Sequence, residues 1–470
     1  MNHHSTADVE RLIALESQYD LWSAEIRGVR LWSQARYAVL SRIITQWLRY
    51  NYPVSTRYRR LTFRDLRRYA RGMTLFSPFR RAHDALFFVT DLGRLPLDTR
   101  HSFDRVHDVY FRLFHNPLII ESNYTPDPSL PDAHFENNHY PHTILSALVR
   151  FPTSSLSAPE QRTVDEFVNY VTEIYQIPAL TPVLRASITT AVSRVNNWRR
   201  IIARTLTPRI ALSPHKKRVA WIENACYLEQ SGLLTSLLHE YGFIVFEAQH
   251  GLLSPFHAAY HVPIDVIDNA EHPARVYYPD VFLTFGDYWS QQARIPSEKF
   301  TIGSPQISRM LNRLDSAKTT KHKQVLVISG DTRAVNLAKV LAQALPDHRF
   351  IFKLHPLEFA RQDEMTALLN YPNMRVLGKT DIYSLIAESE IIIGHNSTAL
   401  VEAAAFANKR IFFYEPAFIP AEVGTRFEDA ETLVRLILDS STGHPSAQPN
   451  DFWELHIQER LEAFGRTYLR

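Results

Sequence analysis

The clearest pattern of apolar and polar positions lies in residues 324–415 of the 470-residue chain. Short runs rich in Val, Ile and Phe, such as QVLVIS, FIF and EIII, alternate there with segments long enough to form helices. This alternation is typical of a parallel sheet whose strands are joined by helices. We therefore expect an α/β domain over residues 324–445.

The same alternation occurs earlier in the chain and predicts a second α/β domain over residues 83–310. Its strand-like runs include ALFFVTD, RVAWIENA, FIVFEA, PDVFLTF and FTIGSP, and residues 107–114 are a candidate strand or buried segment. Apolar residues at helical spacing predict a helical insertion over residues 142–207. The Pro-rich residues 123–141 indicate a loop and the polar residues 306–323 a linker. The last segment, 450–470, is expected to form a helix that packs back across the interface.

Residues 1–82 are predicted to be mostly helical and carry a marked excess of arginine, including Arg27, Arg30, Arg36 and Arg42. Apolar residues between them recur at helical spacing. A basic amphipathic helix of this kind can lie on an anionic membrane surface. It can equally pack on its own domain with a solvated basic face, or bind another anionic partner. The membrane-surface helix and the helix packed on its own domain both stay open, as does binding to another anionic partner.

Composition narrows the class of protein. Hydrophobic residues make up 45% and charged residues 21%, which indicates a globular protein. The single cysteine, Cys226, excludes an internal disulfide and a Cys-based metal site. No signal peptide or membrane-spanning run is recognisable, so we expect a cytoplasmic protein, with association at the inner face of the membrane as an added hypothesis. The oligomeric state is not indicated.

The first cluster that can carry chemistry is Gln249-His250-Gly251, which follows the strand-like run FIVFEA. In open α/β sheets, ligands bind outside the carboxyl ends of the strands. Glycine there lets the backbone approach a ligand, and His250 could act as a general base with a pKa near working pH. A structural histidine in a turn is the alternative. Further residues close enough to line the same cleft are His257, Tyr260 and His261.

The second cluster is Lys353-Leu354-His355-Pro356, which follows FIF. Strand alternation puts Lys353 and His355 on one side of the strand. A cation and an imidazole there suit a diphosphate or a nucleoside monophosphate leaving group. The alternative is a solvated strand end.

The third cluster begins at Asn396 after the run IIIG. Ser397 or Thr398 can cap the helix that starts there, and the free N–H groups and dipole of that helix make an anion site. Glu402, one turn further on, is placed to reach ribose hydroxyls. Each residue alone also fits an ordinary helix start with a surface glutamate.

Two carboxylates are weaker candidates, Asp331 after QVLVISG and Glu223 in WIEN. Either could act as a base or nucleophile at the cleft, or cap a neighbouring helix. The chain has no P-loop, HExxH, G-x-S-x-G or dinucleotide fingerprint, and no Asp-x-Asp triplet at a strand end to hold a divalent metal. We therefore expect no metal and no cofactor, with phosphates bound through helix ends and side chains.

Taken in order, His-Gly, Lys-x-His-Pro and Ser-Thr-x-x-x-Glu resemble the bacterial GT-B transferases that build capsules, lipopolysaccharide and teichoic acids. These include CDP-glycerol glycerophosphotransferases, polysialyltransferases and capsule Kdo transferases. The resemblance covers about residues 200–450. It implies two Rossmann-like domains facing a cleft, with the donor nucleotide held by the C-terminal one. It also implies a base role for His250, and donor contacts through Lys353, His355, Ser397, Thr398 and Glu402.

The sequence departs from the family in two places. Gln249 stands where the glycerophosphotransferases carry Trp, and the acidic-acidic-Gly motif of the polysialyltransferases is absent. The donor can therefore be CMP-, CDP- or UDP-linked. The resulting expectation is a metal-independent glycosyltransferase that moves a sugar from a nucleotide-activated donor to a surface polysaccharide or lipid-linked acceptor. The alternatives are CDP-polyol phosphate transfer, a nucleotide-sugar epimerase, and a non-catalytic scaffold that binds polysaccharide or nucleic acid.

Overall fold

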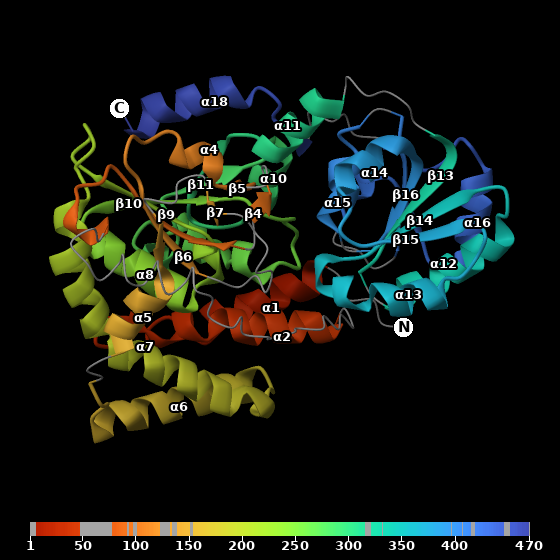
Figure 1. Cartoon of the computed structure of the whole chain (residues 1–470). Coiled ribbons are helices and arrows are strands. Elements are labelled where there is room, and N and C mark those ends of the chain that lie inside the picture. Colours follow the sequence, from red (N-terminus) through yellow and green to blue (C-terminus); the bar gives the residue numbers. More distant parts are fainter. Residues whose placement is uncertain are drawn as a thin grey trace.

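The computed structural model of the chain contains two main β-sheets, one in each half (Figure 1). It describes residues 6–47, 78–91, 94–96, 101–122, 132–133, 139–150, 154–314, 321–330, 332–395, 397–406, 408–414, 419–445 and 452–469. Both sheets are parallel and are wound with helices, as the alternation of apolar runs and helix-length segments predicts. The predicted fold class, two Rossmann-like α/β domains, is confirmed.

The first sheet has seven parallel strands in the order β8-β6-β3-β9-β10-β11-β12. They are β3 (Leu86–Thr90), β6 (Leu118–Ser122), β8 (His139–Pro141), β9 (Arg218–Ile222), β10 (Phe243–Ala248), β11 (Val281–Thr284) and β12 (Glu298–Thr301). The chain moves outward from β3 to β8 and then returns to β9 beside β3, so the strand order reverses between β3 and β9. A crevice opens at the carboxyl ends of the strands where the order reverses.

Burial on both faces explains why these strands are continuous apolar runs. In β3, Leu86 and Phe88 face one core while Phe87 and Val89 face the other. All four side chains are buried. A strand enclosed on both faces has no position at which a polar side chain could reach water. The sequence therefore shows a solid apolar run and not an alternating one.

The second sheet has six parallel strands in the order β15-β14-β13-β16-β17-β18. They are β13 (Lys321–Ile328), β14 (Arg349–Lys353), β15 (Met374–Leu377), β16 (Ser389–Gly394), β17 (Arg410–Tyr414) and β18 (Thr425–Phe427). Its helices are α12 (Thr332–Ala344), α13 (Gln362–Leu368), α14 (Ile382–Glu388), α15 (Thr398–Ala403) and α16 (Ala430–Leu438). The order reverses between β13 and β16, which puts the second crevice there.

The other elements belong mainly to the first half. The helices are α4 (Asp108–Phe111), α5 (His142–Arg150), α6 (Ala158–Ile174), α7 (Thr181–Ile201), α8 (Glu229–Glu240), α9 (Ile264–Asp268), α10 (Asp287–Gln292) and α11 (Pro305–Leu314). Short strands outside the two main sheets are β1 (Glu25–Ile26), β2 (Val29–Arg30), β4 (Arg94–Pro96), β5 (His101–Asp104) and β7 (Asp132–Ala133). Helices α6 and α7 form the long hairpin below the first sheet in Figure 1.

Three segments differ from the sequence-based expectation. Residues 107–114 contain the short helix α4 and no strand, and the burial of Tyr110 and Phe111 agrees with the alternative expectation of a buried segment. The expected linker 306–323 contains most of α11, whose apolar residues Ile307 and Met310 are buried. The expected loop 123–141 supplies an edge strand, β8, which pairs with β6. In each case, contacts with distant parts of the chain decide the conformation of a short segment whose local pattern is weak.

Three of the described N-terminal arginines, Arg27, Arg30 and Arg36, are paired with carboxylates within the protein. In α2 (Arg36–Trp47), Arg36 is fully buried and lies 2.8 Å from the carboxylate of Glu16, which belongs to α1 (Thr6–Gln18). Arg27 pairs with Glu160 at 2.7 Å, and Arg30 pairs with Glu25 at 3.0 Å. The apolar face of α2 packs into the core of the first domain through Val39, Leu40, Ile43 and Ile44. In α2, packing on its own domain is therefore what the structure shows; residues 48–77 lie outside the described part.

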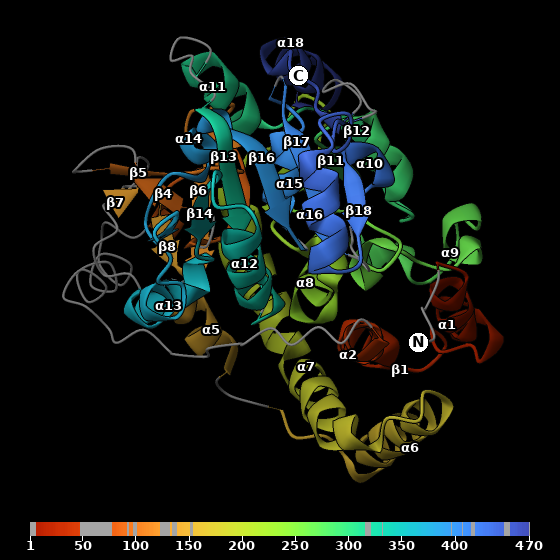
Figure 2. The same ribbon diagram turned by 90° about the vertical axis from the view of Figure 1, so that its right-hand side faces the viewer.

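The C-terminal segment returns to the first domain and joins it to the second. Trp453 stacks near Phe285 of the first domain and donates from its indole N–H to the backbone oxygen of Val401 in the second, at 3.4 Å. Beyond it, α18 (Ile457–Phe464) lies over the first sheet at the top of Figure 1. Phe464 of this helix packs on Trp221 and Phe246. The view in Figure 2 shows the same helix close to β12 and α10.

Candidate active site

The reversal point of the first sheet carries Glu223, directly after β9. Its carboxylate accepts hydrogen bonds from the backbone N–H of Thr90 at 2.5 Å and from the Thr90 hydroxyl at 3.1 Å. Burial raises the pKa of Glu223 to about 7, the charge of His107 opposes that rise and Asp104 adds to it. A carboxyl group with a pKa near neutrality can accept or release a proton under ordinary conditions.

Beside Glu223 lies a buried pair that the sequence analysis did not select. Asp104, the last residue of β5, accepts a hydrogen bond from Nδ1 of His107 at 3.1 Å and from the backbone N–H groups of Val106 and His107. Burial alone lowers the pKa of His107, but the carboxylate of Asp104 outweighs it and the net shift is upward. Nε2 of His107 is buried without a partner among the described residues. The D-x-x-H spacing at the start of α4 is the only local signal of this pair.

The predicted cleft residues after β10 have different roles. Gln249 is 1% exposed. Its side-chain N–H donates to the backbone oxygen of Gly251 at 2.9 Å, and its side-chain oxygen accepts from the backbone N–H of Phe285 at 2.8 Å. These hydrogen bonds hold the turn next to the end of β11, and Gln249 does not line the cavity described below. Gly251 has no positive φ, and a Cβ there would meet open space. Its missing side chain leaves room in the cavity.

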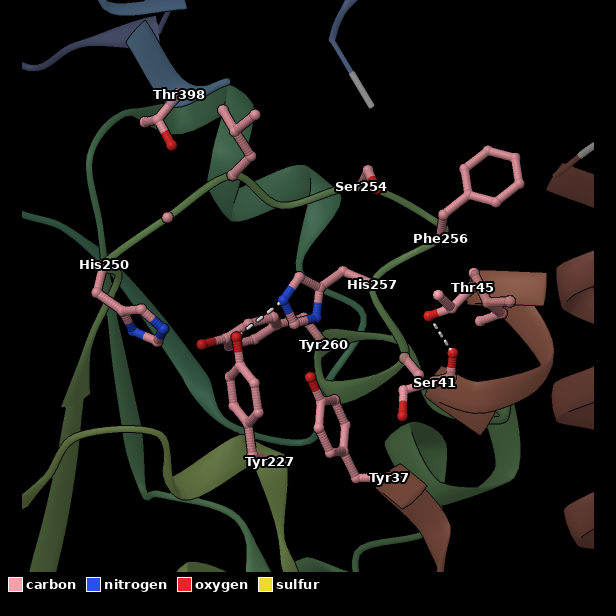
Figure 3. Close-up of a pocket in the computed structure, with 14 residues that line it drawn as sticks. Tyr37, Ser41, Thr45, Tyr227, His250, Ser254, Phe256, His257, Tyr260 and Thr398 are labelled. Carbon is pink, nitrogen blue, oxygen red and sulfur yellow. Dashed lines mark hydrogen bonds between the residues drawn. The ribbon is translucent and has the colours of Figure 1, made fainter. Parts of the chain in front are cut away.

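His250 points into that cavity, toward Tyr227 and His257 (Figure 3). Its ring centroid lies 5.8 Å from that of Tyr227, and its Nδ1 has no hydrogen-bond partner among the described residues. Burial, together with the charges of His257 and His107, lowers the pKa of His250 to about 3. The expectation of a pKa near working pH is therefore wrong: the ring is neutral at physiological pH because it is buried.

The cavity has a volume of about 300 Å³ and lies between α2, the loop after β10 and the start of α15. Among the described residues of the second domain, Thr398 is the one that lines it. The lining residues are Tyr37, Ser41, Ile44 and Thr45 of α2, Tyr227, then His250, Gly251, Leu252, Ser254, Phe256, His257, Ala258 and Tyr260, and finally Thr398. The predicted pair His250 and Thr398 thus meets at one cavity, joined by the predicted residues Gly251 and His257.

Arg36 holds two walls of the cavity together. Its guanidinium donates to the backbone oxygens of Ala258 and His261, each at 2.6 Å, while also pairing with Glu16. This contact joins α2 to the loop that carries His257. It places the ring of Tyr37 4.6 Å from that of Tyr227, centroid to centroid. The ring nitrogen Nε2 of His257 lies 3.0 Å from the Tyr227 hydroxyl.

The predicted donor residues on α15 are only partly available for binding. The Ser397 hydroxyl accepts a hydrogen bond from the backbone N–H of Ala399 at 3.3 Å, as expected for a helix cap. Glu402 is hydrogen-bonded to Tyr383, and burial raises its pKa against the opposing charge of Arg105. Arg105 belongs to the first domain, so this charge acts across the cleft. Asn396 and Asp331 lie outside the described residues.

Lys353, the last residue of β14, and His355 just beyond it do not line the cavity. Lys353 is 6% exposed and donates from Nζ to the backbone oxygen of Leu354 at 2.9 Å. Burial lowers the pKa of Lys353 to about 8. Burial also lowers the pKa of His355, whose backbone N–H is held by Glu358 at 2.9 Å. A donor role for Lys353 and His355 stays a prediction.

The reversal point of the second sheet holds a cluster that sequence reasoning missed. One Nη of Arg333 lies 3.1 and 3.2 Å from the ring nitrogens of His395, and its guanidinium lies over the ring of Tyr414 at 5.0 Å. Ser329, directly after β13, is 2% exposed, and its hydroxyl has no partner among the described residues. The signals were present in the sequence, since Ser329-Gly330 and His395 each directly follow a strand. A buried hydroxyl and a planar cation at this point suit a phosphate.

Metal ligation and membrane insertion find no support in the described part of the chain. No group of three or more His, Cys, Asp or Glu side chains within that part is arranged to hold a metal ion. Among the same residues, no helix has both the length and the apolar character needed to cross a bilayer.

Comparison with known proteins finds structural similarity at low sequence identity. No protein-family model matches the chain, and no curated protein matches it in sequence. The solved structures that it resembles include UDP-GlcNAc 2-epimerase from Neisseria meningitidis, with 10% identity and a TM-score of 0.44 over 82% of this chain and 100% of that one. Acinetobacter baumannii MurG matches with 11% identity and a TM-score of 0.41, over 82% and 100% of the two chains.

The wall teichoic acid polymerase TagF matches with 11% identity and a TM-score of 0.37, over 92% of both chains. GT-B transferases are thus among the similar structures. At TM-scores of 0.37 to 0.44, these overlaps carry no argument about activity. What the site does has to be inferred from its own residues.

Proposed function

We propose that the chain is a glycosyltransferase that moves a sugar from a nucleotide-activated donor to a hydroxyl group of a surface polysaccharide or lipid-linked acceptor. One observation carries the proposal: His250 of the first domain and Thr398 of the second line the same cavity. A transfer reaction needs an acceptor site and a donor site that meet at one point. Two α/β domains with their reversal points turned to a shared cleft meet that need.

In the proposed reaction, the acceptor hydroxyl attacks the anomeric carbon of the donor sugar. A bond forms between the acceptor oxygen and that carbon, while the bond from the carbon to the phosphate oxygen breaks. The hydroxyl proton passes to a base, and the nucleotide leaves with the bonding electron pair. Two groups can take this proton: Glu223, whose pKa is raised to about 7, and the neutral His250, which lines the cavity.

Charge that develops on the departing phosphate has to be stabilised in the second domain. Arg333 supplies a planar cation at the reversal point, and Ser329 supplies a buried hydroxyl that has no partner among the described residues. Lys353 and His355 supply a cation and an imidazole at the end of β14, the strand next to β13, for a donor phosphate that reaches this strand. Fixed donors of this kind act strongly in a dry site. We propose that these groups do so without a divalent metal, and activity that survives EDTA is the corresponding test.

Calorimetry with CMP, CDP and UDP tests the proposal most directly. We expect one of the three to bind, with the affinity falling as salt is raised, because the contacts are to phosphate. If none of them binds, a scaffold that binds polysaccharide or nucleic acid becomes the better account. If a nucleotide-sugar is converted to its epimer in the absence of any acceptor, the chain is an epimerase. Transfer of polyol phosphate from a CDP-polyol would instead show the teichoic-acid type of reaction.

A further inference from the structure

The described residues that line the cavity of His250 carry no formal charge. Among them there is no Lys, Arg, Asp or Glu. Both histidines are neutral, because burial lowers the pKa of His250 to about 3 and that of His257 to about 4. Arg105, whose charge acts on His250, is not among the lining residues. A carboxylate or phosphate placed here would lose its water without gaining a counter-ion, which is strongly unfavourable.

Polar atoms around the cavity lack the partners that buried polar atoms normally have. The hydroxyl of Ser254 and the Nδ1 atoms of His250 and His257 are all buried without a hydrogen-bond partner among the described residues. Ser254 is 7% exposed. Buried polar side chains are usually hydrogen-bonded, so these three atoms at one cavity can bond a ligand that enters it. Hydroxyl groups of a ligand can form these bonds, because each both donates and accepts.

The walls between these polar atoms are aromatic. Tyr37 and Tyr227 have ring centroids 4.6 Å apart, and Tyr227 and Tyr260 have theirs 6.0 Å apart. Phe256 stands at the edge of the cavity, above Tyr37 and Thr45 of α2 (Figure 3). The faces of aromatic rings are electron-rich and attract C–H groups that carry partial positive charge. The C–H faces of a sugar ring are of that kind, while its rim presents hydroxyls.

We propose that this cavity binds a neutral sugar ring, the terminal residue of the acceptor, with its hydroxyls on Ser254, His250 and His257. The inference rests on the proposed function, because it takes His250 as the group that faces the reacting hydroxyl. The acceptor fits the cavity better than the donor sugar does, since every described lining residue except Thr398 belongs to the first domain. At about 300 Å³ the cavity is at the small end of ligand sites, which suits one ring and not a chain.

Saturation-transfer NMR and calorimetry on the full chain, with no nucleotide present, test this inference. The probes are the methyl glycosides of glucose, galactose, mannose and N-acetylglucosamine, compared with methyl glucuronide and glycerol 3-phosphate. We expect at least one neutral glycoside to bind and both acidic probes to fail. Ser254→Ala should weaken that binding about 5- to 10-fold, the usual effect of one lost hydrogen bond. Tyr37→Leu should weaken it by removing an aromatic wall.

Ser297→Ala is the matched control. Ser297 is 5% exposed and its hydroxyl also has no partner among the described residues, but it does not line the cavity. The inference is overturned if an acidic probe binds as well as the neutral ones, or if Ser254→Ala and Ser297→Ala behave alike. It is also overturned if neutral sugars respond only when linked to a nucleotide, because the cavity would then hold the donor sugar.

The two proposals fail in different ways. A chain that binds a nucleotide but no free neutral glycoside contradicts the acceptor inference and leaves the transferase proposal standing. A chain that binds no nucleotide contradicts the transferase proposal, whatever the glycosides do. The melting temperature of each variant is compared with that of the wild type. Where the two are equal, a loss of binding is not caused by a loss of folding.

Discussion

Arg36 and Glu16 form a fully buried ion pair, 2.8 Å apart, that also fixes the loop behind the candidate acceptor cavity. The guanidinium also donates hydrogen bonds to the backbone oxygens of Ala258 and His261. A buried pair of this kind is costly to break, because the partner that remains is a charge without compensation. Arg36 is therefore a structural residue of the site, although the sequence alone made it a candidate for membrane binding.

Replacing Arg36 by Met should lower the free energy of unfolding by about 3–5 kcal/mol, since Glu16 is left buried and unpaired. Urea denaturation followed by fluorescence measures the change. The control is Arg42→Ser on the same helix, where the side chain is exposed and the expected change is within about 0.5 kcal/mol. Equal stability of the two variants would contradict the assignment.

The pH dependence of transfer should reveal which group takes the proton. The pKa of Glu223 is raised to about 7, so its carboxylate form, the base, is populated only as the pH rises through that value. We expect kcat/KM to increase with pH and to level off above about 7. Glu223→Gln should reduce the rate by about 10²–10⁴-fold and abolish the inflection. A rate that is flat from weakly acidic to neutral pH would point instead to His250, whose pKa of about 3 keeps it deprotonated throughout.

His107 offers an independent check on the same inflection. Its charge lowers the pKa of Glu223, while Asp104 raises it. Removing the imidazole in His107→Gln should therefore move the midpoint of the pH profile to higher pH. A purely structural role for His107 would lower the rate at every pH and leave the midpoint where it is.

Arg333 should control the affinity for the nucleotide. Arg333→Ala removes the planar cation at the reversal point of the second sheet and should weaken nucleotide binding by about 10-fold or more, as expected for a charged hydrogen bond. Arg333→Lys should recover only part of this, because Lys lacks the planar fork. Arg435→Ala, on the exposed side of α16, is the control. Calorimetry measures the nucleotide affinity of the three variants. An unchanged affinity in Arg333→Ala would show that Arg333 is not part of the donor site.

His261 should make the folded state sensitive to acid. Burial lowers its pKa from 6.5 to about 4, so the unfolded chain takes up a proton before the folded one does. The contribution of His261 to stability is complete above pH 6.5 and is lost as the pH falls toward 4. Relative to the wild type, His261→Gln should gain about 3 kcal/mol of stability between these values. Unfolding at several pH values measures this, with the exposed His444→Gln as the control.

Much of the fold could be predicted from local pattern. The apolar runs that became β3, β9, β10, β13 and β16 are solid because parallel strands are buried on both faces, and this is visible in any window of a few residues. Because the carboxyl ends of such strands form the ligand edge, His250 and Thr398 could be selected from their positions in the sequence. Weakly patterned segments were harder to assign: residues 107–114 left a strand and a buried segment open, and they contain a helical turn because Tyr110 and Phe111 pack in a core formed by other elements.

By itself, the sequence determined the two α/β domains and the edge of each sheet where chemistry can occur, because both follow from short-range periodicity. Only the tertiary structure decided which side chains meet there. The ion pair of Arg36 is completed by carbonyls more than 200 positions away, and Arg333 reaches His395 across 62 positions. Tyr37 enters the cavity because α2 packs beside the loop after β10. Contacts between residues so far apart in the sequence produce no periodic pattern along the chain. The burial that results from these contacts sets the pKa values on which the proposed reaction depends.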